Sequence, residues 1–392
     1  MSLERRQPTI FLHPVFFRLP PSAITSVLDI ARQRLARTFP PAKPWTTGRD
    51  VVRALGAVQA QDYEGAKWAL SQRTPGATEK AIEDEFASGA ILRTHVLRPT
   101  WHFIDPEDIR WMLALTGPYV SKRMANYDRQ LGITDIHYRR CNAALEKTLR
   151  DGAHLTRAEL KEALSRANVG TLGVQRAAHL LMRAELDAVI CSGPRRGKQF
   201  TYALLDERAP AAPAKDRDES LLELTRRYFR TRSPATAQDF SWWSGLPMSD
   251  VRRGIELARS GLEQVMIDDK SYWSDGSAPA RPTASAHLLP NYDEFFIGYR
   301  DRGAIGRRLN STRAVTGWNT AFTHVVAIDG QLVGGWKRSP ARGKIKLTVS
   351  LLDTLSAAER TRVLAEVRRF ERFAGVSVEL TGLDDRKRAA KR

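Results

Sequence analysis

Residues 155–204 read LTRAELKEALSRANVGTLGVQRAAHLLMRAELDAVICSGPRRGKQFTYAL. Thr156 precedes Glu159 by three positions, which is the spacing of a capping box, so the sequence predicts a short helix over residues 157–164. Apolar residues at intervals of three and four then predict a second helix over residues 172–186. Two consecutive helices joined by a short turn are typical of the helix-turn-helix class.

A hairpin is predicted directly after the second helix, because the apolar runs 188–191 and 200–204 flank a tip that contains glycine and proline. Helix, helix and hairpin in this order indicate a winged helix, in which the second helix reads DNA and Arg176 lies on its outer side. The predicted tip carries three cations that suit phosphate groups: Arg195, Arg196 and Lys198.

Composition limits the class of protein. A chain of 392 residues is long enough for two to four units with filled cores. The net charge of +18 and the isoelectric point near 10.2 favour a polyanionic partner, since binding to phosphates releases counterions. A solvated, arginine-rich surface explains the charge equally well, and the basic hairpin tip favours nucleic acid.

The sequence predicts a soluble monomer of the cytoplasm, close to the nucleoid, with no membrane contact. The cysteines are Cys141 and Cys191, both within apolar patterns, so we expect buried thiols and neither a disulfide nor a metal site. His13 and Pro14 interrupt the first apolar run, which argues against a signal peptide, and no run reaches the roughly 18 apolar residues of a membrane span. No cofactor is expected, because a phosphate-binding glycine loop and a nucleophile elbow are both missing.

The helix–helix–helix–hairpin pattern recurs three times, which predicts an α+β fold with a mainly helical N-terminal part and tandem winged-helix repeats. The strand-like runs 322–328, 331–337 and 345–351 predict a β-rich C-terminal domain. A run rich in alanine and proline at residues 209–215 separates the second and third repeats. The predicted boundaries are an N-terminal extension 1–23, winged helices 24–138, 139–208 and 216–286, the β-rich domain 287–381 and a basic tail 382–392.

Gln59-Ala60-Gln61 is the first segment that could carry chemistry. The two amides end the apolar run 51–58 of a helix predicted to begin after Thr47. In an extended or turning segment both could converge on one point, whereas on a helix residues two apart do not share a face. From the spacing alone, two glutamines that cap a helix end are the more common case.

Arg98, Thr100 and His102 alternate with apolar neighbours, so one extended strand would present all three on one face. His102 alone is more often a satisfied strand histidine, and Arg98 beside a phosphate is the functional alternative. The paired tryptophans Trp242 and Trp243 indicate core packing more often than base stacking, and the segment 288–302 indicates a strap between domains more than a site.

These segments, in this order, resemble the AlkZ/YcaQ family of bacterial DNA glycosylases. The resemblance rests on the Gln59-Ala60-Gln61 motif, on Arg98-Pro-Thr-Trp-His102, on the Pro-Ala-Thr opening of the third repeat, and on Leu289-Pro-x-x-Asp-Glu through Gly-Tyr-Arg-Asp-Arg302. It covers residues 24–380. The chain departs from the family in its extension 1–23 and in a first repeat lengthened around residues 39–44.

The resemblance implies three winged helices followed by a barrel-like domain, and hydrolysis of the N-glycosidic bond of alkylated purines, including crosslinked N7-guanine adducts. It assigns catalysis to Gln59 and Gln61, with water positioned by amides because the alkylated base already carries a positive charge. The expected partner is damaged double-stranded DNA in a basic groove, lined by residues that include Arg98, Thr100, His102, Arg176, Arg195, Arg196, Lys198, Lys337 and Arg338.

Two other classes fit the basic repeats. A regulator or architectural DNA-binding protein needs no paired glutamines and discriminates between operator sequences. A protein-interaction scaffold would have no measurable affinity for DNA at moderate salt. The Gln-Ala-Gln motif favours the enzyme over both.

Overall fold

The computed structural model describes residues 27–40, 44–169, 173–209, 211–277, 283–309 and 324–383. The predicted extension 1–23 and residues 384–392 of the predicted tail lie outside the described residues. None of the described helices has the length and apolar character needed to cross a membrane.

The first repeat contains three helices and a three-stranded sheet whose order is β1-β3-β2. Its elements are α2 (Gly48–Leu55), β1 (Val58–Gln59), α3 (Tyr63–Ser71), α4 (Glu79–Ser88), β2 (Leu92–His95) and β3 (Trp101–Ile104). Thr47 and Asp50 form the capping box of α2. The predicted helical run to residue 58 is wrong at its end, because Gly56 has a φ of 83° and Val58 then pairs with Phe103.

The second repeat has the same order of elements and the same sheet order, β4-β6-β5. The capping box of Thr156 and Glu159 is confirmed. The elements are α6 (Asp135–Thr148), β4 (Leu155–Thr156), α7 (Arg157–Arg166), α8 (Val174–Leu186), β5 (Ile190–Ser192) and β6 (Thr201–Leu204), followed by the one-turn helix α9 (Leu205–Arg208).

The third repeat again has three helices and a hairpin, and a single bridge between Ala235 and Trp273 stands in for the short first strand. The predicted opening at Thr236 is confirmed, since its side chain caps α11. The elements are α10 (Arg217–Arg232), α11 (Ala237–Ser244), α12 (Met248–Leu257), η1 (Arg259–Gly261), β7 (Glu263–Ile267) and β8 (Lys270–Ser274).

Two further helices lie outside the elements of the three repeats. The helix α5 (Ile109–Gln130), which the sequence analysis did not single out, runs between the first and second repeats and packs against α8 and α10. The helix α1 (Val27–Thr38) packs against α10 and against the short helices α13 (Glu294–Ile297) and η2 (Gly303–Ile305).

The C-terminal region is a five-stranded sheet of order β13-β12-β11-β10-β9. It consists of β9 (Ala286–Leu289), β10 (Val325–Ile328), β11 (Gln331–Ala341), β12 (Lys344–Leu351) and β13 (Val378–Thr381), with α16 (Ala357–Ala374) between the last two strands. The predicted barrel is wrong for the described residues: β12 and β13 are parallel, joined across α16, and the sheet is left open with β9 and β13 at its edges.

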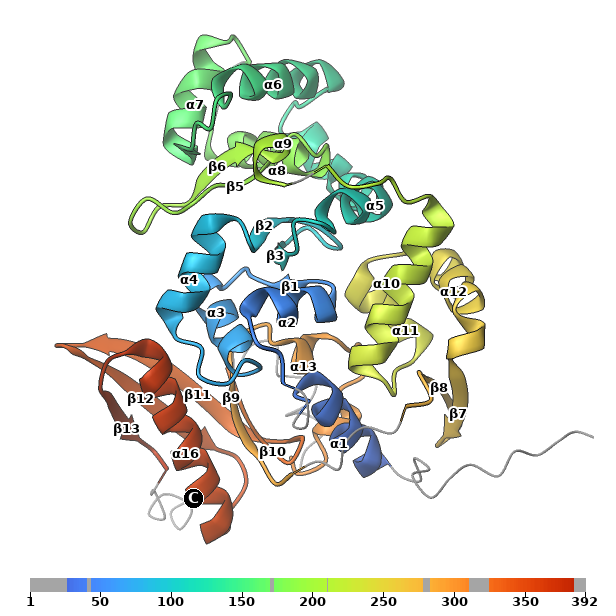
Figure 1. The fold of residues 1–392 in the computed structure, drawn as a ribbon, viewed down its shortest axis with the longest axis vertical. Coiled ribbons are helices and arrows are strands. Elements are labelled where there is room, and N and C mark those ends of the chain that lie inside the picture. The colour runs from blue at the N-terminus through green and yellow to red at the C-terminus, as the bar shows by residue number, and fades with distance from the viewer. Residues whose placement is uncertain are drawn as a thin grey trace, which may run out of the picture.

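The first repeat lies at the centre of the molecule (Figure 1). Strand β2 contacts β5 and α8 of the second repeat, α2 contacts α10 of the third, and α3 contacts α16. Trp68 on α3 is fully buried in the C-terminal core and donates to the carbonyl of Leu288 at 2.7 Å. The second repeat, the third repeat and the C-terminal region therefore all contact the first repeat, which carries the Gln-Ala-Gln motif.

Gly245 offers a test of the contact between the first and third repeats. It ends α11 with a φ of 72°, and a Cβ there would lie 2.1 Å from the carbonyl oxygen of Leu97. Gly76 has a similar φ of 78° with nothing within 4 Å of its Cβ position. Both Gly→Ala changes impose left-handed backbone strain, of the order of 1 kcal/mol.

We expect Gly245→Ala to lower the free energy of unfolding well beyond the loss caused by Gly76→Ala. Only at Gly245 does the added Cβ clash with the backbone of another segment, at Leu97. Urea denaturation of the two variants measures the difference. Equal losses would show that the two repeats do not meet at Leu97 in solution.

Candidate active site

Gln59 lies on β1 and is nearly buried, with 6% of its surface exposed. Its backbone N–H donates to Oε1 of Glu294 at 3.0 Å, and its side-chain Oε1 accepts from Nη2 of Arg98 at 2.7 Å. The helix-capping interpretation of the glutamines is wrong, because α2 ends at Leu55 with Gly56 as its C-cap, and Asp62 caps the start of α3. Instead, hydrogen bonds hold Gln59 at both its backbone N–H and its side-chain amide.

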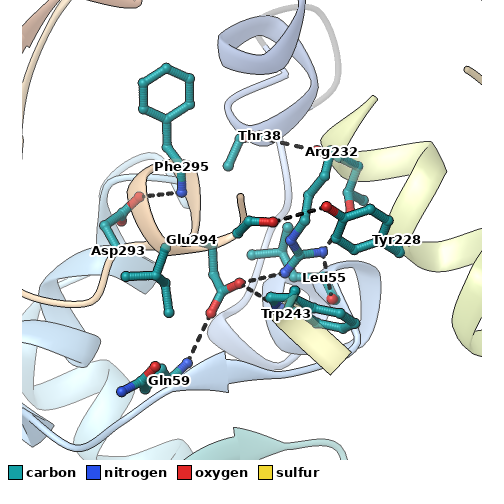
Figure 2. Close-up of polar contacts among 12 residues, drawn as sticks. Thr38, Leu55, Gln59, Tyr228, Arg232, Trp243, Asp293, Glu294 and Phe295 are labelled. Carbon is teal, nitrogen blue, oxygen red and sulfur yellow. Dashed lines mark hydrogen bonds and ion pairs between the residues drawn. The ribbon is translucent and has the colours of Figure 1, made fainter. Parts of the chain in front are cut away.

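Glu294 links Gln59 to the third repeat (Figure 2). Its Oε2 accepts from Nη2 of Arg232 at 2.6 Å and from Nε1 of Trp243 at 2.8 Å, and neither Glu294 nor Arg232 has any exposed side-chain surface. Arg232 also donates to the carbonyl of Leu55, at the end of α2. The buried pair of Glu294 and Arg232 thus joins α2, β1, α10 and α11 at one point.

The neighbouring residue Asp293 makes a second buried ion pair. Both of its oxygens accept from Arg73, at 2.8 and 2.9 Å, and Arg73 lies just beyond the end of α3. Farther along, the hydroxyl of Tyr299 donates to the carbonyl of Arg232. These contacts confirm the interpretation of segment 288–302 as a strap, which bonds the first and third repeats together.

Gln61 differs from Gln59 in its surroundings. Its side chain is exposed, and its Oε1 accepts from the backbone N–H of Trp101 at 3.4 Å. The adjacent Asp62 lies 3.5 Å from Nε2 of His324 and 4.0 Å from Nη2 of Arg338 on β11. The motif therefore combines one fixed amide and one amide that faces solvent.

The predicted continuous strand through Arg98, Thr100 and His102 is wrong. Leu97 has a φ of 63°, tight turns bond Arg98 N–H to Val96 and Thr100 N–H to Arg98, and β3 begins only at Trp101. Arg98 and Thr100 therefore lie in the turn before the strand. This turn brings the Arg98 guanidinium to Gln59, where burial lowers the pKa of Arg98.

His102 pairs with Gln59 across the sheet and is completely buried. Its Nδ1 donates to the carbonyl of Thr100 at 2.9 Å, since a carbonyl oxygen only accepts. Burial, with the nearby Arg98, holds the pKa of His102 well below 6.5, so the ring is neutral at physiological pH. Direct contact of His102 with DNA would require the sheet to open.

Several predicted DNA contacts are engaged within the protein. Arg176 donates to the carbonyl of Leu131 at 2.8 Å. Arg195 packs between the first and second repeats with its Nη1 3.2 Å from Glu64, and Arg196 pairs with Glu159 at 2.7 Å. Lys198 and Lys337 are exposed, and Arg338 is half-buried beside Asp62.

Both cysteines are buried and free, as expected. Trp243 is fully buried, as predicted for a core residue, whereas Trp242 is 46% exposed and donates to the carbonyl of Ile297 at 3.2 Å. Among the residues that the structure describes, no group of three or more histidine, cysteine, aspartate or glutamate side chains could hold a metal ion.

The role of Glu294 was not predicted from the sequence. It lies 235 positions from Gln59 in the chain, so no local pattern connects the two residues. A signal was nevertheless available: two adjacent acidic residues follow an apolar strand, where burial requires a cationic or hydrogen-bonding partner.

The chain matches the family model described as "DNA glycosylase AlkZ-like" over residues 52–373, so it belongs to the AlkZ-like DNA glycosylase family, and the resemblance drawn from its motifs is confirmed. It is accordingly an enzyme, a DNA glycosylase of the hydrolase class that acts in DNA repair.

Two comparisons agree with this family. A relative from Streptomyces sahachiroi named "Interstrand DNA cross-link repair glycosylase" is 24% identical over 322 residues, which are 78% of this chain and 85% of the relative. The solved structure of Streptomyces sahachiroi DNA glycosylase AlkZ has a TM-score of 0.74 at 21% identity, covering 91% of this chain and 99% of that one. The two proteins share their fold.

The buried pair of Glu294 and Arg232 should be essential for stability. Glu294→Gln leaves the Arg232 charge buried without its carboxylate, and we expect a loss of about 3–5 kcal/mol in the free energy of unfolding. The control is Asp84→Asn, which breaks the exposed pair with Lys80 and should change stability little. Denaturant titration of both variants checks this, and similar small losses would contradict it.

His102 gives a prediction for acid. In the unfolded chain an ordinary histidine binds a proton below about pH 6.5, whereas folded His102 does not, so stability falls as the pH drops below this value. His102→Asn removes the titration. Between pH 6.5 and 5, its unfolding free energy should fall less steeply than that of the native protein, by up to about 1.4 kcal/mol per pH unit. Identical slopes would refute the buried neutral ring.

Proposed function

We propose that this glycosylase hydrolyses the N-glycosidic bond of N7-alkylated purines in double-stranded DNA, including bulky or crosslinked N7-guanine adducts. The name of the Streptomyces sahachiroi relative, an interstrand cross-link repair glycosylase, supports this substrate class. The observation that carries the proposal is the arrangement of the two amides: Gln59 is fixed by Arg98 and Glu294, and exposed Gln61 lies two positions away.

The chemistry suits amides because the leaving group needs little help. N7-alkylation gives the purine a positive charge, so the C1′–N9 bond breaks with its electron pair passing to the base, which departs neutral. Water attacks C1′ and its proton passes to solvent. Gln61 orients this water and Gln59 steadies it or the sugar, which is catalysis by positioning and electrostatics.

The rigidity of Gln59 supports this role. An amide contributes most when its orientation is set before the substrate binds, since no free energy is then lost in ordering it. The bond from Arg98 fixes which end of the Gln59 amide is the carbonyl, and Glu294 fixes the strand beneath it.

We further propose a monofunctional reaction without a Schiff base. Lys67 on α3 is the lysine nearest in sequence to the motif, and its Nζ lies within 3.0 Å of Glu64, Glu79 and Glu83. Burial opposes its charge, but the hydrogen bonds that Lys67 donates to Glu64 and Glu79 outweigh burial and raise the pKa of Lys67. A lysine held protonated in this way is a poor nucleophile.

We assign DNA binding to the three repeats and to the hairpin of β11 and β12 in the C-terminal region. We propose that the three repeats are tandem winged helices and that the protein acts as a monomer near the nucleoid. Lys198 at a hairpin tip, with Lys337 and Arg338 on β11, contact phosphates, because Lys198 and Lys337 are exposed and Arg338 lies beside Asp62 of the motif segment. Arg195 and Arg196, which already pair with carboxylates, contribute less.

Base excision from an oligonucleotide with one N7-methylguanine tests the proposal. With enzyme in excess, we expect Gln59→Ala and Gln61→Ala each to slow abasic-site formation by about 10²–10³-fold, as for the loss of one preorganised hydrogen-bonding group. The matched control is Gln264→Ala, which removes an exposed amide on β7 and should excise normally.

A duplex with an N7-linked interstrand crosslink extends the same assay to bulky adducts. Excision of N7-methylguanine at the native rate by the Gln59→Ala/Gln61→Ala double variant would overturn the catalytic assignment. A native protein that releases neither adduct would overturn the proposed substrate class.

A further inference from the structure

Cations and aromatic rings alternate in a continuous ladder across the boundary of the first and second repeats. Its three rings are Trp101, Phe200 and Tyr63, and its four cations are Arg157, Arg93, Arg195 and Lys67. Arg93 lies between two rings, 4.4 Å from the centres of both Trp101 and Phe200. Arg195 likewise lies between Phe200 and Tyr63, at 5.1 and 4.8 Å.

The two ends of this ladder differ in charge. At one end Lys67 and Arg195 are neutralised by a group of glutamates: Glu64, Glu79 and Glu83. At the other end, neither Arg93 nor Arg157 forms an ion pair with any carboxylate of the described residues. The nearest acidic influence is Glu185, which is already bonded to His95. Within the described part of the chain, two positive charges therefore lack an ion-pair partner.

The uncompensated end lies against the catalytic motif. The Nε–H of Arg93 donates at 3.1 Å to the carbonyl of Ala60, the residue between the two glutamines. Trp101, whose ring packs under Arg93, donates its backbone N–H to Gln61. An arginine has five N–H donors, and the bond to Ala60 uses only one of those on Arg93.

Burial makes a lone cation here costly. Arg93 is only 7% exposed, and burial lowers its pKa to about 10, so it still carries its charge at neutral pH. The aromatic faces stabilise the guanidinium by cation–π attraction, which amounts to only about 1–2 kcal/mol. A buried charge that is retained without a carboxylate is typical of a site that receives an anion from outside.

We propose that Arg93 and Arg157 form a phosphate-binding site for the DNA strand that carries the lesion, next to Gln61. This assignment rests on the proposed function, which supplies the DNA. Arg157 and Trp101 are half-buried, so a phosphate approaches along their open side, and the more deeply buried Arg93 supplies the second positive charge. The phosphate fixes the sugar of the lesion relative to the two glutamines.

The experiment measures affinity for an unmodified duplex as a function of salt, for the native protein, Arg157→Gln and Arg93→Gln. Each variant should weaken binding roughly tenfold at low salt and reduce the slope of log K against log salt concentration by about 0.9, the value for one phosphate contact. The control Arg368→Gln removes the same charge from an exposed position on α16 and should leave both quantities unchanged.

Arg157→Gln changes only a half-buried side chain, so it remains informative if Arg93→Gln fails to fold, as judged by its thermal melt. A native salt slope in Arg157→Gln overturns the phosphate site, even if the native protein excises N7-methylguanine and the proposed function stands. A reduced slope together with no excision by the native protein supports the phosphate site and overturns the proposed substrate.

Discussion

The buried carboxylate of Glu294 is the constraint on which the rest of the structure depends. It lies in the protein interior together with the guanidinium of Arg232, and each charge loses its hydration. Removing one member of such a pair is costly, and here further bonds hold both: Glu294 also accepts from Trp243 and from the Gln59 backbone, and Arg232 donates to the Leu55 carbonyl, although its Nε has no partner among the described residues. The bonding requirements of one side chain thus fix the relative positions of the first and third repeats.

This constraint is also what makes the active site rigid. Gln59 cannot move without breaking the bond from its backbone to Glu294 and the bond from Arg98 to its amide. Among the described residues, Gln61 is held by one longer contact, with the backbone of Trp101. A fixed amide and an accessible one suit a reaction in which the leaving group is already activated and the enzyme has mainly to position water.

The cationic side chains of the protein are of two kinds. Many arginines are structural: Arg73, Arg195 and Arg232 each pair with an acidic side chain inside the fold. Net charge alone therefore overstates the surface available to DNA. The informative cations are those beside the motif that have no carboxylate partner among the described residues: Arg98, which bonds to the Gln59 amide, and the pair of Arg93 and Arg157.

The sequence by itself determined the local elements and the family. The capping box at Thr156 predicted where a helix begins, because the cap and the residue that it bonds are only three positions apart. Only the tertiary structure decided that the Gln59 backbone bonds to Glu294 and that the turn before β3 places the Arg98 guanidinium against the Gln59 amide. It also decided that the C-terminal sheet stays open. These outcomes depend on desolvation and packing between residues far apart in the chain, which leave no periodic signal in the sequence.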